Sequence, residues 1–314
     1  MRFLFKNWSK YFSSIGIILF IFILSKVDLD SFLLIFKQAK YLYLLFLPFS
    51  IFLIFFVQTL KWQKLLKIQK LEYNFWYLFK VHIISNYYAL LTPSRLGYFV
   101  KIGYLNNPFG VVGASVLIDR ILDTLVLIVF ASIGAFLLVS QFPNLIFQIS
   151  IFTFCFILVV LFFYSKSRAK LLFSFFKKII PPKFHNSLKI VFHDFYNSLP
   201  RRRKLLIPFL LTIITWLLIY SQTYLIAQAF NININFWYFI FYFPIATIVG
   251  LIPVTISGLG TREAVLIMLF SQFNISIESI ITLSISSLIL ISYLPAIYGA
   301  FLSFKLKKTS QLER

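Results

Sequence analysis

Charged side chains are scarce in this 314-residue sequence: only 12% are Asp, Glu, Lys or Arg, against about a quarter in a soluble domain. Hydrophobic residues make up 60% and aromatic residues 20%. Several nearly uncharged runs of about 20 residues are long enough to cross a hydrocarbon layer of roughly 30 Å. The runs are continuously apolar rather than alternating, which excludes a transmembrane β-barrel. The sequence therefore predicts an all-α, polytopic membrane protein.

Residues that build common catalytic and metal sites are also few. Cys155 is the single cysteine, so there is no disulfide framework and no cysteine metal site. The three histidines lack metal-ligand spacing, and the nine acids are too sparse for a divalent-metal transferase site. No phosphate-binding loop of an ATPase, no H-E-x-x-H and no Ser-His-Asp set is found. We therefore expect no cofactor, no metal and no enzyme activity.

Basic residues dominate the charge that is present. The formal net charge is +21, but most Lys and Arg flank apolar runs, which favours the positive-inside rule and anionic lipid over nucleic acid. An apolar run also follows Arg2, Lys6 and Lys10, without a signal-peptide cleavage site, so we expect a retained first helix. The predicted location is the cytoplasmic membrane of a prokaryote, with both termini in the cytoplasm. The predicted full spans are Tyr11–Val27, Tyr41–Leu60, Ile121–Val139, Leu145–Tyr164, Leu205–Phe230 and Ile277–Phe304.

Two apolar regions do not fit as simple spans. With the lysines after the second span and the loop 165–204 placed inside, region 75–105 must start and end in the cytoplasm, and region 236–273 must start and end outside. Each contains a Pro/Gly break beside an arginine, so each is interpreted as a re-entrant helical hairpin. Six full helices and two hairpins then form an inverted repeat. The alternative is eight full spans with irregular surface loops.

The whole chain, 1–314, is interpreted as a single integral membrane domain. The basic loop 165–204 is too short for a separate enzyme core. Apolar residues recur in it at helical spacing after Pro181 and Pro182, which predicts either a basic amphipathic helix on the cytoplasmic surface or a small packing helix between spans.

Charged residues at membrane depth mark the candidate site, because each costs at least about 2.5–3.5 kcal/mol to insert. At the second break, the glycines permit a tight turn, Thr261 can cap the following helix, and Arg262 supplies a forked donor suited to phosphate. We expect an anion cradle at the N-terminus of that helix. The alternative is that Arg262 pairs with an acid such as Asp119 or Asp123 and only holds the bundle together. The candidate residues of this break are Gly258, Gly260, Thr261, Arg262 and Glu263.

The first break, with Pro93, Arg95 and Gly97, lies at the tip of the other hairpin, so two arginines can converge from opposite sides. The alternative is that Arg95 extends to the headgroups at the membrane boundary. Between the breaks, Arg120 and Asp123 are three residues apart and can pair on one helix face. Asp119 and Asp123 are interpreted either as part of a structural ion pair, or as acids that hold Arg95 or Arg262 or carry protons. Polar residues such as Asn86 and Gln222 are interpreted as contacts between helices.

Three segments in this order resemble the flippase-like family, also called the lysylphosphatidylglycerol synthase transmembrane-region family. They are Pro93-Ser-Arg95-Leu-Gly97-Tyr98, Ser115-Val-Leu-Ile-Asp119-Arg120-Ile-Leu-Asp123 and Pro253-Val-Thr-Ile-Ser-Gly258-Leu-Gly260-Thr-Arg262-Glu263. The first departs from the family pattern, which usually has glutamate where Tyr98 stands. The resemblance implies lipid translocation, or a role in polyprenyl- or aminoacyl-lipid metabolism.

The leading hypothesis is a flippase for a lipid with an anionic phosphate headgroup, such as an aminoacyl-phospholipid or a polyprenyl-phosphate-linked lipid, held by Arg95 and Arg262. The expected partners are that lipid and the bilayer, and no nucleic acid. One alternative is a transporter of a small organic anion. Another is an integral membrane lipid-linked transferase or its accessory subunit. The sequence does not identify the headgroup, the direction of transport, any coupling ion or the oligomeric state.

Overall fold

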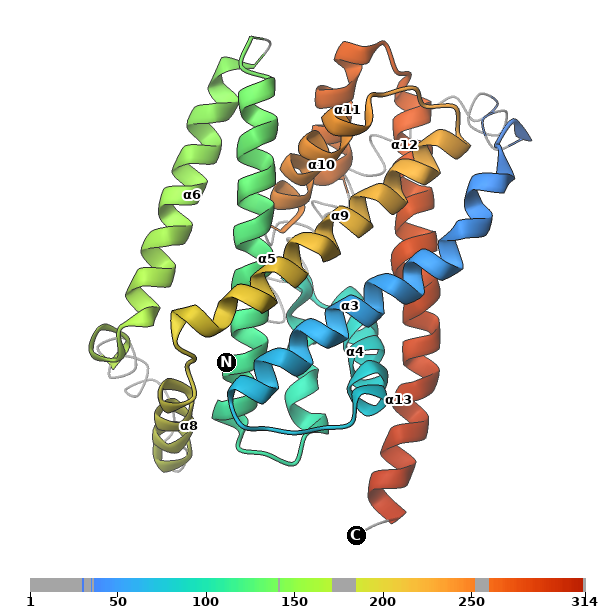
Figure 1. The fold of residues 1–314 in the computed structure, drawn as a ribbon. Helices are drawn as coiled ribbons and strands as arrows, with labels where there is room; N and C mark the ends of the chain where they lie inside the picture. The colour runs from blue at the N-terminus through green and yellow to red at the C-terminus, as the bar shows by residue number, and fades with distance from the viewer. Residues whose placement is uncertain are drawn as a thin grey trace.

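A computed structural model describes residues 30, 35, 37–140, 142–170, 185–251 and 260–312. Every regular element in these residues is helical, which confirms the predicted all-α membrane fold (Figure 1). The expected first span, Tyr11–Val27, lies outside the described residues.

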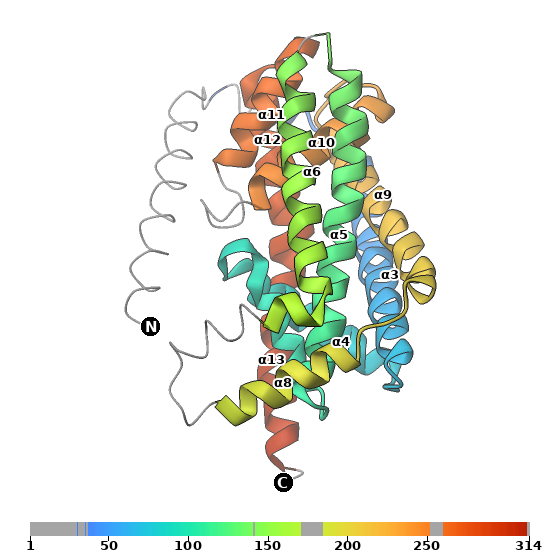
Figure 2. The same ribbon diagram turned by 90° about the vertical axis from the view of Figure 1, so that its left-hand side faces the viewer.

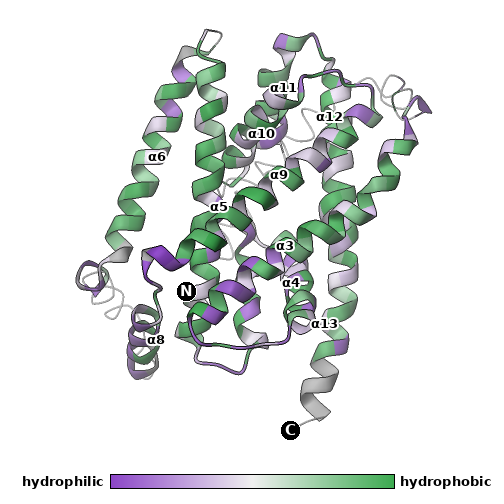
Figure 3. Cartoon of the chain, viewed as in Figure 1, coloured by the Kyte–Doolittle hydropathy of each residue, from purple (hydrophilic) through white to green (hydrophobic). Residues whose placement is uncertain are grey.

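Four helical stretches are long and apolar enough to cross a membrane: Tyr41–Ile68, Asn144–Phe162, Arg203–Ala229 and Ile277–Leu306. They correspond to α3 (Leu47–Ile68), α6 (Pro143–Tyr164), α9 (Leu206–Ala229) and the run α12 (Ile277–Ser287), η7 (Leu288–Tyr293) and α13 (Leu294–Leu312). Figure 3 shows hydrophobic residues along most of α6 and α9, and hydrophilic residues concentrated at the end of the molecule that carries α8.

Helix α5 (Phe109–Leu137) begins well before Ile121, where the apolar run starts. Its 29 residues give a length of about 44 Å, enough to cross a bilayer. The additional N-terminal turns carry Asp119 and Arg120, and Asp119 is completely buried. Packing against neighbouring helices therefore extends α5 through residues that hydropathy excludes from a span.

The first predicted hairpin consists of α4 (Phe75–Leu90) and η2 (Pro93–Tyr104), which pack along each other. Asn74 caps α4 by accepting hydrogen bonds from the backbone N–H groups of Trp76 and Tyr77. The arms touch at Gly97, where an added Cβ atom would lie 2.1 Å from the carbonyl carbon of Tyr88. A residue without a side chain is therefore required for the two arms to approach this closely.

The second predicted hairpin consists of α10 (Phe236–Leu251) and α11 (Thr261–Phe270), which also pack together. Phe270 stacks on Phe239 with ring centroids 5.7 Å apart, and this contact joins the arms near their open end. A short turn, η6 (Ser271–Phe273), and Asn274 in a left-handed conformation end the hairpin. Residues 252–259, including Gly258 and Pro253, lie outside the described part of the chain.

The two halves of the described chain have the same order of elements: a long helix, a hairpin and a second long helix. Helix α3 packs on α9, α5 packs on the α10 arm, and α13 packs on the α4 arm. Each of the last two contacts depends on a glycine: a Cβ on Gly134 would lie 2.1 Å from the carbonyl oxygen of Phe241, and one on Gly299 would lie 2.6 Å from that of Ile83. Figures 1 and 2 place the two hairpins toward opposite ends of the molecule. These relations support the inverted repeat, whereas the number of membrane crossings stays a prediction.

Helix α8 (His185–Asn197) occupies part of the predicted basic loop and lies across one end of the bundle (Figure 2). It packs against the start of α5, where a Cβ on Gly110 would lie 2.4 Å from the carbonyl oxygen of Val191. The predicted helix in this loop is thus present, with one face on the bundle.

Candidate functional site

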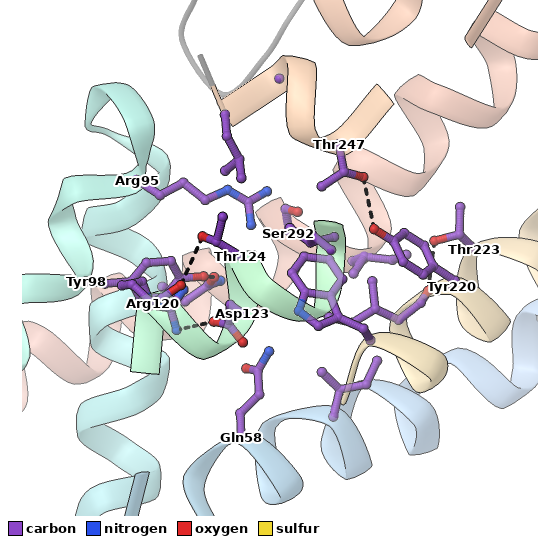
Figure 4. A pocket seen from close by; sticks show the side chains of 18 of the residues that line it. Gln58, Arg95, Tyr98, Arg120, Asp123, Thr124, Tyr220, Thr223, Thr247 and Ser292 are labelled. Atoms are coloured by element: carbon purple, nitrogen blue, oxygen red, sulfur yellow. Dashed lines mark hydrogen bonds and ion pairs between the residues drawn. The ribbon is translucent and has the colours of Figure 1, made fainter. Parts of the chain in front are cut away.

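A cavity of about 380 Å³ lies where the two hairpins meet the long helices (Figure 4). Its walls come from α3, α4, η2, α5, α9, α10, α11 and the α12–η7 segment, so residues far apart in the sequence share one space. Among its described lining residues are three arginines, Arg95, Arg120 and Arg262, and a single acid, Asp123. The two arginines expected to converge therefore do so.

Arg95 lies on η2, just after the break of the first hairpin, and its side chain points into the cavity (Figure 4). Within the described residues, its guanidinium group has neither an ion pair nor a hydrogen bond. Its backbone is left-handed, with φ of 55°, which costs an L-residue other than glycine about 1–2 kcal/mol. Arg95 is thus a half-buried cation, available to a ligand and held in a strained conformation of the kind found at functional sites.

Arg262 is fixed in place by its neighbours on α11 and α12. Its guanidinium group donates to Glu263 Oε1 at 3.0 Å and to Ser284 Oγ at 2.6 Å. Ser284 Oγ also donates to Glu263 Oε1 at 2.5 Å, which closes a three-residue network. The acid partner of Arg262 is Glu263, not Asp119 or Asp123, so the alternative that Arg262 pairs with an acid and holds the bundle together stays a prediction.

The start of α11 differs from the sequence expectation. Gly260, with φ of 84°, is the N-cap, and Thr261 is the first helical residue, so the prediction that Thr261 caps this helix was wrong. The backbone N–H of Gly260 donates to Glu263 Oε2 at 2.6 Å. A left-handed turn favours glycine at this position, and the glutamate three residues later takes over the capping.

Asp119, Arg120 and Asp123 form the core of a buried ion network beside the cavity. Arg120 lies 2.8 Å from Asp123 and 2.6 Å from Asp119, so the predicted pairing of Arg120 with Asp123 is confirmed. Lys61 lies 2.7 Å from an oxygen of each acid. The expectation that these acids hold Arg95 or Arg262 was wrong, because their ion-pair partners are Lys61, Arg120 and Lys101.

Two lysines of this network were not identified as site residues. Lys61, expected in the cytoplasm, is 1% exposed, because α3 continues past the apolar run and carries it into the bundle. Lys101 is completely buried, with its ammonium group 4.7 Å from the ring centre of Trp62 and 3.2 Å from Nδ1 of His82. A basic residue at the end of an apolar run normally faces the cytoplasm, so no sequence pattern indicates that Lys61 is buried.

Tyr98 forms part of the wall between the ion network and the cavity. Its ring lies 4.1 Å from the guanidinium carbon of Arg120, a cation–π contact (Figure 4). Its hydroxyl group donates to Asn86 Oδ1 at 3.2 Å. Where the family pattern has a glutamate, this chain thus places an uncharged ring that contacts an arginine.

Other polar residues of the wall were missed or were interpreted only as helix contacts. Gln58, Asn86, Trp216 and Gln222 line the cavity, and Tyr220 donates to Thr247 at 3.2 Å across the far wall (Figure 4). Among the described residues that line the cavity, three buried N–H donors, Asn86 Nδ2, Arg120 Nε and Trp216 Nε1, have no hydrogen-bond partner, and neither does one acceptor, Gln222 Oε1. A wall with this many unmatched N–H groups suits a ligand rich in acceptor oxygens.

The remaining predicted binding residues shape the site without lining the described cavity. Gly97 joins the arms of the first hairpin, and its N–H donates to Thr92 Oγ1 at 2.6 Å. Pro93 is the first residue of η2. Gly260, Thr261 and Glu263 build the start of α11 that carries Arg262. In the parts of the chain that the structure describes, no three His, Cys, Asp or Glu residues gather as metal ligands would.

The charges on the cavity wall and in the ion network behind it do not balance. Lys61, Lys101 and Arg120 face only two acids, Asp119 and Asp123. Arg262 is matched by Glu263, and Arg95 has no counter-charge among the described residues. Uncompensated charge is costly away from water, so the cavity is suited to an anion.

Comparison with known proteins agrees with these features. Residues 11–299 match the family described as the lysylphosphatidylglycerol synthase TM region. The chain is also similar to UPF0104 membrane protein MJ1595 of Methanocaldococcus jannaschii, with 27% identity over 90% of this chain and 91% of that protein. The match covers both hairpins and the ion network. The chain is therefore a multi-pass membrane protein that belongs to the lysylphosphatidylglycerol synthase transmembrane-region family, a family linked to lipid synthesis or translocation.

Proposed function

We propose that this protein moves a lipid with an anionic phosphate headgroup from one leaflet of the membrane to the other. The headgroup enters the cavity between the hairpins, where Arg95 and Arg262 bind its phosphate oxygens, while the hydrocarbon tails stay in the bilayer. Aminoacyl-phospholipids and polyprenyl-phosphate-linked lipids both have this chemistry. In this proposal the protein lies in the cytoplasmic membrane of a prokaryote with both termini inside, and it does not alter the lipid chemically.

The observation that carries the proposal is that Arg95 and Arg262, from hairpins of different halves, line the same cavity. The two residues have complementary properties. Arg262 is held by Glu263 and Ser284, so it provides a fixed donor, whereas Arg95 has all its donors available within the described chain. Arginine suits phosphate because its planar fork matches two oxygens at once.

The arrangement of the halves supports movement as well as binding. In transporters built from inverted repeats, the substrate site lies where the repeats meet, and one half rocks against the other. Here the cavity lies at that meeting point, and the second long helix of each half, α5 or α13, contacts a hairpin arm of the other half through a glycine, Gly134 or Gly299. Small sliding movements of packed helices are one way in which such halves move against each other.

The test is lipid transfer in reconstituted liposomes. The probe is phosphatidylglycerol with a fluorophore on one acyl chain, and a membrane-impermeant reductant bleaches the outer leaflet. We expect native protein to give complete bleaching and Arg95→Gln to slow it by roughly tenfold to a hundredfold, because a hydrogen bond to a charged group contributes about 1.5–3 kcal/mol. Arg168→Gln is the matched control, since Arg168 is exposed beyond α6.

The outcomes separate the candidate functions. Equal rates for native protein and Arg95→Gln would contradict the proposal. Transport of a soluble organic phosphate into the liposomes, without lipid transfer, would favour the alternative of a small-anion transporter. A modified lipid formed by the purified protein would favour the transferase.

A further inference from the structure

We infer that the cavity takes up a proton together with its anion, and that the proton site is the buried pair of Lys101 and His82 behind the cavity wall. This inference rests on the proposed function, because it assigns a coupling ion to the same site. The cavity binds the anion through Arg95 and Arg262, and the lysine behind Tyr98 and Arg120 gains its proton as the anion arrives.

The surroundings of Lys101 are unusual for a permanently charged ammonium group. Lys101 is completely buried on η2, and its ammonium group contacts the faces of Trp62 and Tyr98 and Nδ1 of His82. The other ring nitrogen of His82 lies 3.0 Å from Gln58 Oε1, a side chain on the cavity wall. A neutral His82 that donates to Gln58 and accepts from Lys101 satisfies both contacts, so the pair can hold a proton and can also release one.

Of the three cations in the ion network, Lys101 has the weakest ion pairing with the acids. Lys61 lies 2.7 Å from Asp119 and Arg120 lies 2.6 Å from it, whereas Lys101 lies 3.7 Å away. Arginine remains protonated under all ordinary conditions, and Lys61 has a second acid, Asp123, at 2.7 Å. Lys101 is therefore the cation that can lose a proton at the smallest cost.

Every element packed around Lys101 contributes to its charge balance. Lys61 faces it from α3, His82 from α4, and Asp119, Arg120 and Asp123 from α5, while Tyr98 lies on η2 itself. With Lys101 protonated, this group has three cations and two acids. With Lys101 neutral, the group is balanced. An anion in the cavity beside Arg95 and Arg120 supplies the missing negative charge and thereby stabilises protonated Lys101.

Anion binding and protonation of Lys101 are linked reciprocally, and each favours the other. If the anion favours protonation of Lys101, protonation favours the anion by the same factor. Binding then takes up a proton and weakens as pH rises, by at most roughly tenfold per pH unit where Lys101 is neutral in the empty protein. A headgroup with one negative charge would then enter the cavity together with one positive charge.

Calorimetry on the purified full-length protein tests this directly. The probe is dihexanoylphosphatidylglycerol, whose phosphodiester stays singly charged between about pH 6 and 9, compared with glycerophosphoglycerol, which has the same headgroup without tails. Titrations at one pH in buffers of different ionisation enthalpy measure the protons taken up. We expect proton uptake that approaches one proton per bound anion at a pH where Lys101 is neutral in the empty protein, and the same uptake by the control Lys64→Gln, which replaces an exposed lysine on α3. Binding of both probes would indicate headgroup recognition alone, and binding of only the first would show that the tails contribute.

Two variants, one permanently charged and one neutral, assign the proton site. Lys101→Arg keeps a permanent charge, and Lys101→Gln has none, so both should bind without proton uptake and with little dependence on pH. Two variants are needed because Lys101 is fully buried and one of them can fail to fold. Anion binding by native protein without proton uptake would overturn this inference and leave the proposed function standing. Proton uptake that persists in a folded Lys101 variant would overturn the assignment. If neither probe binds at any pH, the proposed function fails as well.

Discussion

Replacement of Asp119 by asparagine tests the buried ion network as a structural unit. Asp119 is completely buried and lies within ion-pair distance of Lys61, Lys101 and Arg120. The variant keeps the shape of the side chain but leaves three cations with one acid. Loss of one partner from a buried ion pair costs about 3–5 kcal/mol, because the remaining charge is uncompensated. We expect a fall in Tm on the order of 10 °C, measured by tryptophan fluorescence of the detergent-solubilised protein.

A second substitution gives this experiment its internal check. Asp119→Asn combined with Lys61→Met leaves two cations and one acid, the same excess as in the native network. The double variant should therefore melt closer to native protein than Asp119→Asn does, a non-additive result expected of residues in contact. Asp194→Asn is the control, since Asp194 lies on α8 and its ion-pair partner among the described residues is His193, 3.9 Å away. Native-like melting of Asp119→Asn, or additive losses in the double variant, would refute the reasoning.

Two further predictions concern the backbone. Gly134→Ala and Gly299→Ala should each lower the free energy of unfolding by about 1–3 kcal/mol, because the new methyl group meets a carbonyl oxygen of the opposite half. The control is Gly103→Ala, whose methyl group meets nothing within 4 Å and which should melt like native protein. Equal melting temperatures for all three variants would contradict the packing described between the halves. Arg95→Gly should raise the free energy of unfolding by up to about 1 kcal/mol, since glycine adopts the left-handed backbone of this position freely. The same variant should lose lipid transfer in liposomes. If it retained transfer, Arg95 would not be part of the binding site.

The sequence predicted those features of this protein that depend on the free-energy cost of a few neighbouring residues in the membrane. A proline, glycines and an arginine inside an apolar run are expensive at membrane depth, so the breaks near Arg95 and Arg262 indicated both hairpins and the residues at their tips. The pairing of Arg120 with Asp123 followed from helical spacing alone. In each case the signal lies within a few residues, where chain geometry decides the outcome.

What the sequence left open depends on contacts between distant helices. Lys61 follows an apolar run and fits the positive-inside rule, but α3 crosses α5 so that its side chain meets Asp119 and Asp123. Glu263, predicted as a binding residue, caps α11 and holds Arg262 both directly and through Ser284, which lies 21 residues further along the chain. Trp216 and Gln58 reach the cavity from α9 and α3. These relations follow from helix packing, which composition and spacing do not encode.

The central claim is that Arg95 and Arg262 together bind one phosphate group between the two hairpins. The most direct measurement is an experimental structure of the protein with dihexanoylphosphatidylglycerol bound. We predict that the phosphate lies in the cavity with oxygens about 3 Å from both guanidinium groups. A phosphate bound outside the cavity, or in contact with neither arginine, would contradict the account.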